Sequence, residues 1–191
     1  TLILKALGWQ GFWIGNQKLE ISYKKSKDFN YIKDYITLEN ITTLAQSGLK
    51  SIDKDNIDVI SFDLDGNDFY LIEDLLKNNF KPKLFIVEYN AKFPPPIKWV
   101  MEYNKAHAWQ EDDYFGASIS SFNDLFEKND YKLICCNSQT GSNAFFIKKE
   151  FEHLFSEVPK KIEDMYVEPR YFLHTKFGHS QSLKTINNFF I

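Results

Sequence analysis

Residues Ile57–Asp68 read Ile-Asp-Val-Ile-Ser-Phe-Asp-Leu-Asp-Gly-Asn-Asp, an apolar run that leads into three closely spaced aspartates, Asp63, Asp65 and Asp68. An apolar run bounded by turn residues is typical of a buried strand in a parallel sheet. In open α/β sheets, ligands bind just beyond the carboxyl ends of such strands. The stretch therefore predicts a group of carboxylates at the reactive edge of an α/β sheet.

Expected strands and helices alternate on both sides of this stretch. Strands are expected over Gly11–Gly15, Tyr31–Thr37, Ile57–Asp63 and Lys83–Asn90. Helices are expected over Leu38–Ser47, with Gly48 as its stop, Phe69–Asn79 and Ser118–Asn129. The last two strands, Tyr131–Asn137 and Asn143–Lys149, are joined by only five residues, which allow a hairpin but no crossover helix. We therefore expect an α/β fold whose mostly parallel sheet ends in an antiparallel hairpin.

Composition limits the class of protein. The 191 residues fit one α/β domain, expected over residues 1–150, with an extension over 151–191 that could be a helical appendage, a substrate wall or a contact in a homo-oligomer. Hydrophobic residues make up 43% of the chain and the net charge is −3, without the basic cluster that nucleic-acid binding needs. No apolar stretch approaches the ~20 residues of a membrane span. We therefore expect neither nucleic-acid nor membrane partners. Because the two cysteines, Cys135 and Cys136, are adjacent and make no disulfide framework, we also expect a cytoplasmic protein.

The loop Ala91–Gly116 is too long and too aromatic to be a plain connector. Loops of this length in compact domains are usually lids or binding loops. We therefore expect Trp99, Trp109 and Tyr114 to contact a substrate. His107 is a candidate general base because the pKa of an imidazole lies near neutrality. The simpler alternative is a surface loop whose aromatic side chains cover the core.

The aspartate cluster itself fits more than one kind of site. Asp63 and Asp65 resemble the nucleophile and Mg²⁺ site of haloacid-dehalogenase-type phosphatases, although Asn67 stands where that family has Thr. Asp-x-Asp after an apolar run also resembles the metal-nucleotide site of glycosyltransferases. An EF-hand loop does not fit, because Gly66 comes too early and the closing Glu is absent. Asn67 or Asp68 could instead cap the following helix, which explains one carboxylate but not Asp63 at the strand end.

A further interpretation takes six segments together: Gly8–Gly15, Leu38–Ile41, Phe62–Tyr70, Ile86–Ala91, Tyr114–Ser118 and Gly141–Phe146. In this order and spacing they resemble FkbM-type S-adenosylmethionine-dependent methyltransferases, particularly a branch found with carbohydrate modification. The resemblance covers roughly Thr1–Lys149. It implies a three-layer Rossmann-like sheet with the class I strand order 3-2-1-4-5-7-6. It also implies that the first strand and its Gly-rich turn precede Thr1, so that this chain is part of a longer protein.

The resemblance assigns roles to particular residues. Gly15 and Asn16 would face the cofactor ribose, Ile36 and Thr37 would flank the adenine, and Asp63 would also face the cofactor. Asp63 and Asp65 would face the methyl-transfer site, directly or through a divalent ion such as Mg²⁺. Glu88, as a catalytic residue, and Asn90, as a substrate residue, would reach the same cleft.

The expected function is O-methyl transfer to a hydroxyl of a sugar, a glycan or a related small polar metabolite. Two alternatives stay open. One is a Mg²⁺-dependent phosphatase that uses Asp63 and Asp65, and the other is a non-catalytic binding module with a methyltransferase-like fold.

Overall fold

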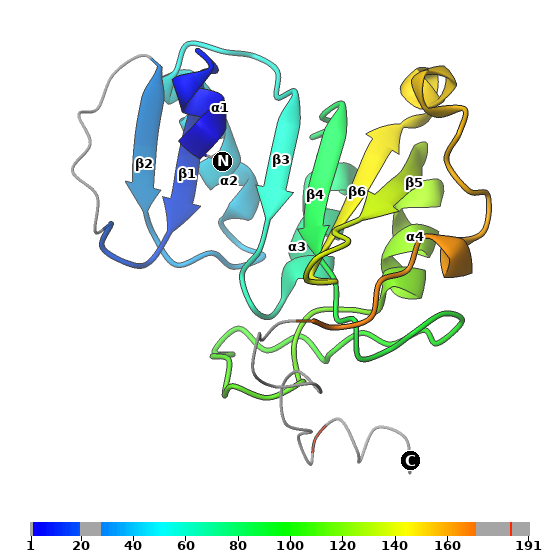
Figure 1. The fold of residues 1–191 in the computed structure, drawn as a ribbon. Helices are drawn as coiled ribbons and strands as arrows, with labels where there is room; N and C mark the ends of the chain where they lie inside the picture. Colours follow the sequence, from blue (N-terminus) through cyan, green and yellow to red (C-terminus); the bar gives the residue numbers. More distant parts are fainter. Residues whose placement is uncertain (1, 20–27, 171–183, 185–191) are drawn as a thin grey trace. The chain divides into compact units, whose positions relative to one another are not determined.

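A computed structural model of the chain describes residues 2–19 and 28–170, together with residue 184 (Figure 1). The chain is mixed α/β, and it divides into two compact units. The first unit comprises Thr1–Asp58 and Asp74–Pro82, and the second comprises Val59–Glu73 and Lys83–Ile191. None of the helices in the described part of the chain has the length and apolar character needed to cross a bilayer.

The first unit contains a two-stranded parallel sheet, β1 (Gly11–Gly15) and β2 (Phe29–Lys33). Helix α1 (Leu2–Ala6) precedes the sheet, and helix α2 (Ile41–Ser51) packs against both strands. The expected bounds of the second strand, Tyr31–Thr37, are therefore wrong. The expected bounds of the following helix, Leu38–Ser47, are also wrong, because α2 begins three residues later and ends four residues later.

The reason for the later start of α2 lies in a turn between the strand and the helix. The backbone N–H of Thr37 donates to the Asn40 side chain at 2.8 Å, and the Asn40 side chain donates to the carbonyl of Tyr35 at 2.9 Å. Asn and Asp favour such local bonds over helix formation. The turn therefore occupies the residues that the apolar pattern had assigned to the strand and to the first helical turn.

Gly48 does not end this helix, as expected, but lies inside it. A Cβ atom at Gly48 would lie 2.2–2.6 Å from ring atoms of Phe12, which is closer than real side-chain atoms approach one another. The glycine therefore lets α2 come close to β1, and the helix continues to Ser51. Sequence reasoning took the lack of a side chain for a stop signal, whereas here it is a packing requirement.

The second unit contains a four-stranded sheet with the order β3-β4-β6-β5. The strands are β3 (Val59–Phe62), β4 (Leu84–Glu88), β5 (Tyr131–Cys136) and β6 (Asn143–Lys148). Strands β3 and β4 are parallel, and β6 is antiparallel to both β4 and β5. The structure thus confirms the expected parallel neighbours and the expected closing hairpin.

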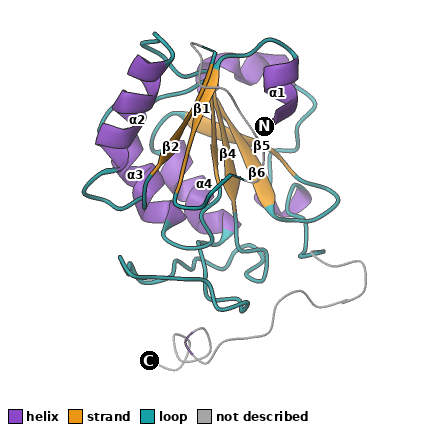
Figure 2. Cartoon of the chain, turned by 90° about the vertical axis from the view of Figure 1, so that its left-hand side faces the viewer, coloured by secondary structure: helices purple, strands orange, loops and turns teal. Residues whose placement is uncertain are grey.

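Two helices begin in this unit, α3 (Asp68–Lys77) and α4 (Ile119–Glu127), and Figure 2 shows the helices beside the strands. Helix α4 is capped by Ser118, whose side chain accepts a hydrogen bond from the backbone N–H of Ser121. It packs against β5, and its Phe126 stacks on Phe146 of β6 with ring centroids 4.1 Å apart. Aromatic pairs of this kind join the helix to the sheet.

The described part of the C-terminal extension belongs to the second unit. Two short 3-10 helices, η1 (Lys149–Phe155) and η2 (Ile162–Asp164), follow β6, and η1 packs against the hairpin. Beyond them, the carbonyl of Val167 accepts a hydrogen bond from the Tyr89 hydroxyl at 2.7 Å. The hydroxyl of Tyr166 donates to the carbonyl of Ala91 at 2.6 Å. This segment therefore runs along the residues that follow β4.

Candidate functional site

Three carboxylates meet where β3 and β4 end. Each of Asp63, Asp65 and Glu88 offers one oxygen, and these oxygens all lie within 4.8 Å of one another. The strand register explains part of this arrangement, because Phe62 pairs with Val87 and the next residues along the two parallel strands are Asp63 and Glu88. Asp63 and Asp65 are exposed and Glu88 is half-buried, so the acidic triad (Asp63, Asp65 and Glu88) is open to solvent on one side. The structure thus brings together the carboxylates that the sequence predicted to share a cleft.

The close approach of these groups raises the proton affinity of the triad. Burial, followed by the negative charges of Asp63, Asp68 and Asp65, raises the pKa of Glu88 to about 9. Desolvation and the charge of Asp65 raise the pKa of Asp63, while a hydrogen bond with Glu88 lowers it. The hydrogen bond between the two carboxyl groups lowers the pKa of Asp63 and raises that of Glu88, so the proton that they share resides on Glu88. Its second oxygen, Oε2, is buried and has no hydrogen-bond partner among the described residues.

Asp68 belongs to the framework of the site rather than to the triad. It is only 1% exposed, and its carboxylate accepts hydrogen bonds from the backbone N–H groups of Leu64 and Gly66, both at 2.9 Å. Burial, the largest cause, raises the pKa of Asp68 to about 6, although these two hydrogen bonds lower it. Asp68 is the first residue of α3, but its hydrogen bonds reach backward, so it closes the turn that carries Asp65 instead of capping the helix that follows.

The loop Ala91–Gly116 is bonded to this turn at several points. The side chain of Asn67 donates to the carbonyl of Asn104 at 2.8 Å and accepts from its N–H at 3.1 Å. The N–H of Gly116 donates to the carbonyl of Gly66 at 2.9 Å. The loop is therefore fixed at its middle and at its end to the residues that position the triad.

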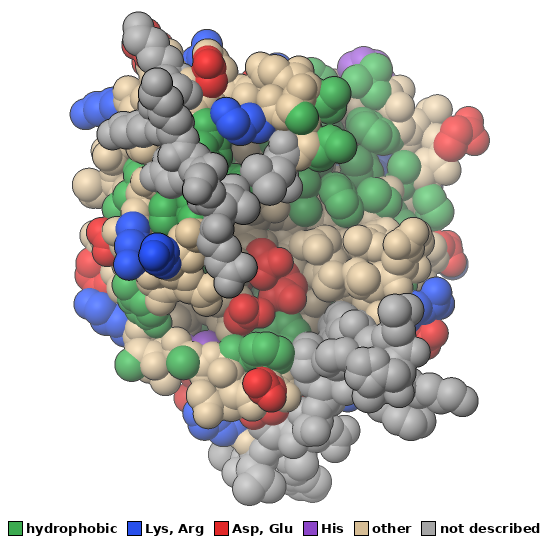
Figure 3. Space-filling view, turned by 60° about the vertical axis from the view of Figure 1, so that its left-hand side comes forward, with side chains coloured by type: hydrophobic (Ala, Val, Ile, Leu, Met, Phe, Trp, Pro, Cys, Tyr) green, Lys and Arg blue, Asp and Glu red, His purple; other side chains and the backbone are tan. Residues whose placement is uncertain are grey.

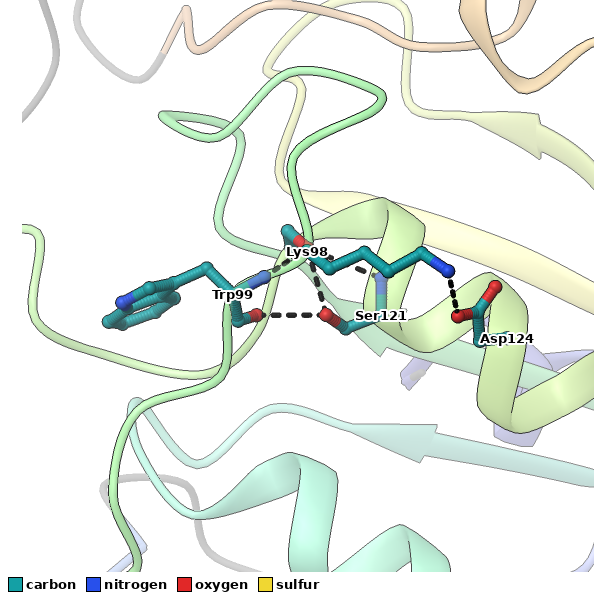
Figure 4. A network of polar contacts seen from close by, with 5 residues as sticks. Lys98, Trp99, Ser121 and Asp124 are labelled. Atoms are coloured by element: carbon teal, nitrogen blue, oxygen red, sulfur yellow. Dashed lines mark hydrogen bonds and ion pairs between the residues drawn. The ribbon is translucent and has the colours of Figure 1, made fainter. Parts of the chain in front are cut away.

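The first half of the loop is also fixed to helix α4 (Figure 4). The carbonyl of Trp99 accepts a hydrogen bond from the Ser121 hydroxyl at 3.1 Å, and Lys98 forms an ion pair with Asp124 at 2.5 Å. The Trp99 ring stacks on Phe93, with centroids 4.4 Å apart and planes at 20°. Because Trp99 is only 7% exposed, its ring packs the interior of the loop and presents little surface to a substrate.

The other predicted substrate residues differ in how accessible they are. Tyr114 is 7% exposed and packs edge-on against Trp99, at 5.8 Å between centroids. Asn90 is fully buried, and its amide donates to the carbonyls of Asp113 and Phe115 at 2.7 and 3.0 Å. Both residues therefore hold the loop in place. Trp109 is half-buried, and its indole N–H donates to the carbonyl of Asp112.

His107 lies directly beside the acidic turn. Its imidazole forms a hydrogen bond with the backbone carbonyl of Asp65, and burial lowers its pKa, so the ring is neutral at pH 7. The ring also lies against Gly66, where a Cβ atom would come within 2.6 Å of Cδ2. His107 thus lies close to the backbone that carries Asp65, and this placement depends on the absence of a side chain at Gly66.

The predicted cofactor residues of the first unit lie where its parallel strands end. Gly15 ends β1, and its carbonyl accepts a hydrogen bond from the Tyr31 hydroxyl at 2.8 Å. Asn16 is exposed, Ile36 is half-buried and Thr37 is buried. Gly15 pairs with Lys33 at the end of β2, so these residues follow the carboxyl edge of the same sheet. Asp63, the fifth predicted cofactor residue, belongs to the second unit.

Sequence reasoning assigned no role to several residues of the site. Asn143 is the β6 partner of Glu88 in the strand register, so its side chain lies on the same face of the sheet. Gly66 and Asn104 fix the positions of His107 and the loop. These two residues lie about 40 residues apart in the chain, and no sequence pattern pairs residues at that distance. The hairpin prediction could have placed Asn143 near the strand end, because the residue begins β6.

Acidic side chains gather at one place on the face of the molecule that Figure 3 displays. Such a gathering favours cations and groups that carry ionisable protons over anionic ligands. No protein-family model, no curated protein and no solved structure matches this chain.

Proposed function

We propose that this protein is an S-adenosylmethionine-dependent O-methyltransferase that acts on a hydroxyl of a sugar, a glycan or a related small polar metabolite. The observation that carries the proposal is the acidic triad at the ends of two adjacent parallel strands, with its oxygens within 4.8 Å of one another. Methyl transfer to a hydroxyl requires that the acceptor oxygen be aligned with the methyl group and lose its proton. A group of carboxylates with raised proton affinity is suited to the second task.

The strand order supports the same proposal. The order β3-β4-β6-β5 corresponds to the segment 4-5-7-6 of the class I methyltransferase order, including its reversed strand. The parallel neighbours β1 and β2 correspond to its strands 2 and 3. The proposal therefore includes a three-layer Rossmann-like arrangement, which is the finer fold that the FkbM resemblance implies.

In this proposal Asp63 is the proton acceptor. Desolvation and the charge of Asp65 raise its pKa and make it a stronger base than an ordinary carboxylate, while the hydrogen bond from Glu88 favours its charged form. Asp65 contributes negative charge from the adjacent turn. The acceptor hydroxyl would bind at the open side of the triad, with Asn143, the register partner of Glu88, as a candidate for a further contact.

The donor set also fits a divalent cation. Two oxygens that bind one Mg²⁺ ion lie at most about 4.2 Å apart, since each ligand stands about 2.0–2.1 Å from the ion. The oxygens of the triad lie within 4.8 Å of one another, so binding of Mg²⁺ would draw them slightly closer together. The buried Oε2 of Glu88 is a ligand atom with no hydrogen-bond partner in the described residues. Asp63, Asp65 and Glu88 would hold the ion, and its charge would lower the pKa of an acceptor hydroxyl. Glu88 would release its proton on binding.

The methyl donor would be bound by the first unit. The chain's own contributions there are the Gly15–Asn16 turn at the end of β1 and the residues Ile36 and Thr37 after β2. Asn16 can donate and accept hydrogen bonds with ribose hydroxyls, and Ile36 offers an apolar side chain to the adenine. The bound cofactor supplies the sulfonium methyl group.

The test is transfer of a labelled methyl group from S-adenosylmethionine to a panel of sugars and small polyols. Asp65→Asn should lower the rate by a factor on the order of 10². Asp164→Asn, at an exposed acid of the second unit, is the matched control and should transfer at the wild-type rate. A wild-type rate in Asp65→Asn would contradict the role of the triad.

Two additional assays separate the alternatives. Hydrolysis of a generic phosphate ester with Mg²⁺, in the absence of methyl transfer, would favour the phosphatase. Activity that survives in excess chelator would exclude the cation but leave Asp63 as the base.

A further inference from the structure

The turn that carries Asp65 has a backbone conformation that residues with a side chain adopt infrequently. Asp65 has φ +52°, in the left-handed region, which Asp tolerates better than most residues but which is still less favourable than the right-handed region. Such a conformation persists only where the surroundings determine it. Asp68 supports the turn from the side of α3, through its hydrogen bonds to Leu64 and Gly66.

His107 supports the same turn through a second set of contacts. Its imidazole bonds to the backbone carbonyl of Asp65, and its Cδ2–Nε2 edge lies over Gly66, where a Cβ atom would be 2.6 Å from Cδ2 and 3.4 Å from Nε2. The imidazole therefore contacts Asp65 and Gly66, whose backbone sets the direction of the Asp65 side chain. The Nε2 atom is enclosed in this contact, which places it poorly for taking a proton from a substrate.

The Asp65–Gly66 turn also fixes the position of His107, through Asn67 and Asn104. The N–H of His107 donates to the carbonyl of Asn104 at 2.9 Å, and Asn104 exchanges two hydrogen bonds with Asn67. Asn67 directly follows Gly66 in the chain. The loop residues His107 and Asn104 and the turn residues Gly66 and Asn67 thus fix one another's positions.

We propose that His107 is a positioning residue: it holds the Asp65–Gly66 turn so that the Asp65 carboxylate points at Asp63 and Glu88. Its effect on catalysis rests on the proposed function, whereas its effect on the geometry of the triad does not. The proposal replaces the general-base role that the sequence predicted for His107.

A double-mutant cycle between Gly66 and His107 tests the contact. Gly66 lies outside the left-handed region, so the cost of Gly66→Ala should come from the imidazole and not from the backbone. Gly66→Ala should lower kcat roughly tenfold in the wild-type background and leave the KM for S-adenosylmethionine unchanged. In the His107→Ala background, Gly66→Ala should change kcat less than about twofold, because the obstructing ring is gone.

The pH profile separates positioning from base catalysis. His107→Ala should keep the acidic limb of the kcat profile, whereas loss of a general base would remove that limb. His153→Ala, at an exposed histidine of the same unit, is the matched control and should leave both kcat and the profile unchanged.

A readout that does not need activity keeps this proposal separate from the proposed function. The ¹³C carboxyl shifts of Asp63 and Glu88 should move in each single variant, and the double variant should match His107→Ala. Wild-type carboxyl shifts in His107→Ala would overturn the positioning role. The same would follow if the kcat losses of the two single variants simply multiplied in the double variant.

If His107→Ala does not fold, His107→Asn with Gly66→Ala provides the same cycle. If no methyl transfer occurs in any variant, the proposed function fails while the carboxyl shifts still decide the role of His107.

Discussion

Asp68 is the residue on which the local geometry of the site depends most. Its carboxylate is buried and satisfies two backbone N–H groups of the turn that carries Asp65. Asp68→Ala would leave both N–H groups without an acceptor, so we expect a loss of about 2–4 kcal/mol in the free energy of unfolding. Asp68→Asn keeps one acceptor oxygen and should lose less.

Urea unfolding at pH 7.5 measures this loss as a lower midpoint with an unchanged slope. Asp164→Ala, at an exposed position, is the control. A midpoint for Asp68→Ala that equals the wild-type midpoint would show that the turn does not need this carboxylate.

Glu88 makes the stability of the protein depend on pH in a direction opposite to that of an ordinary ion pair. The folded state raises the pKa of Glu88 from 4.5 to about 9, so between these values the folded state holds a proton that the unfolded state has released. Stability should therefore fall as pH rises from about 5 to 9. The raised pKa of Asp68, about 6, adds a smaller fall at the acidic end.

Thermal unfolding in chelator across this pH range tests the assignment. Glu88→Gln carries no titrating proton and should flatten much of the decline between pH 7 and 9. An equally steep decline in Glu88→Gln would assign the effect to other groups.

At the scale of elements, the packing of α2 on β1 depends on Gly48. Replacing glycine by alanine inside a helix normally stabilises it by about 1 kcal/mol. Here the new Cβ would lie 2.2–2.6 Å from the Phe12 ring, so we expect the sign to reverse and Gly48→Ala to lower the Tm.

Two controls isolate this clash. Ser47→Ala, at the exposed neighbouring position, should leave the Tm unchanged or raise it slightly. Gly48→Ala combined with Phe12→Leu should recover part of the loss, and a failure to recover would point to a backbone cause.

The elements also show where sequence reasoning succeeded. Apolar runs with turn residues at their ends identified β3 and β4, and the short connection identified the β5–β6 hairpin, because these signals are local. The late start of α2 depends on local bonds among Tyr35, Thr37 and Asn40 that compete with the helix, so the apolar pattern alone does not predict it. The continuation of α2 through Gly48 could not be predicted either, because the partner ring comes from β1.

The candidate site follows the same division. Asp63 and Glu88 were predictable because parallel strands end at one edge and their register is regular. The loop was recognised by its length, but the burial of Trp99 and Tyr114 depends on their stacking with each other and with Phe93. Composition shows that a loop is aromatic but not whether its rings face a ligand or the loop interior.

At the level of the whole molecule, the proposed function concerns both sheets. The smaller sheet pairs β1 with β2, the larger one has the order β3-β4-β6-β5, and the acidic triad lies at the strand ends of the larger one. The proposed methyltransferase and its phosphatase alternative differ in one property, because binding of an S-adenosyl ligand is required only by the first. Cofactor binding is thus the property on which the central claim depends.

Isothermal titration of the protein with S-adenosylhomocysteine measures that property directly. We expect saturable one-to-one binding, which weakens when Asn16→Ala or Thr37→Ala is introduced and persists in Asp164→Asn. Absence of binding heat at saturating ligand, with the protein folded by circular dichroism, would contradict the claim that this protein is a methyltransferase.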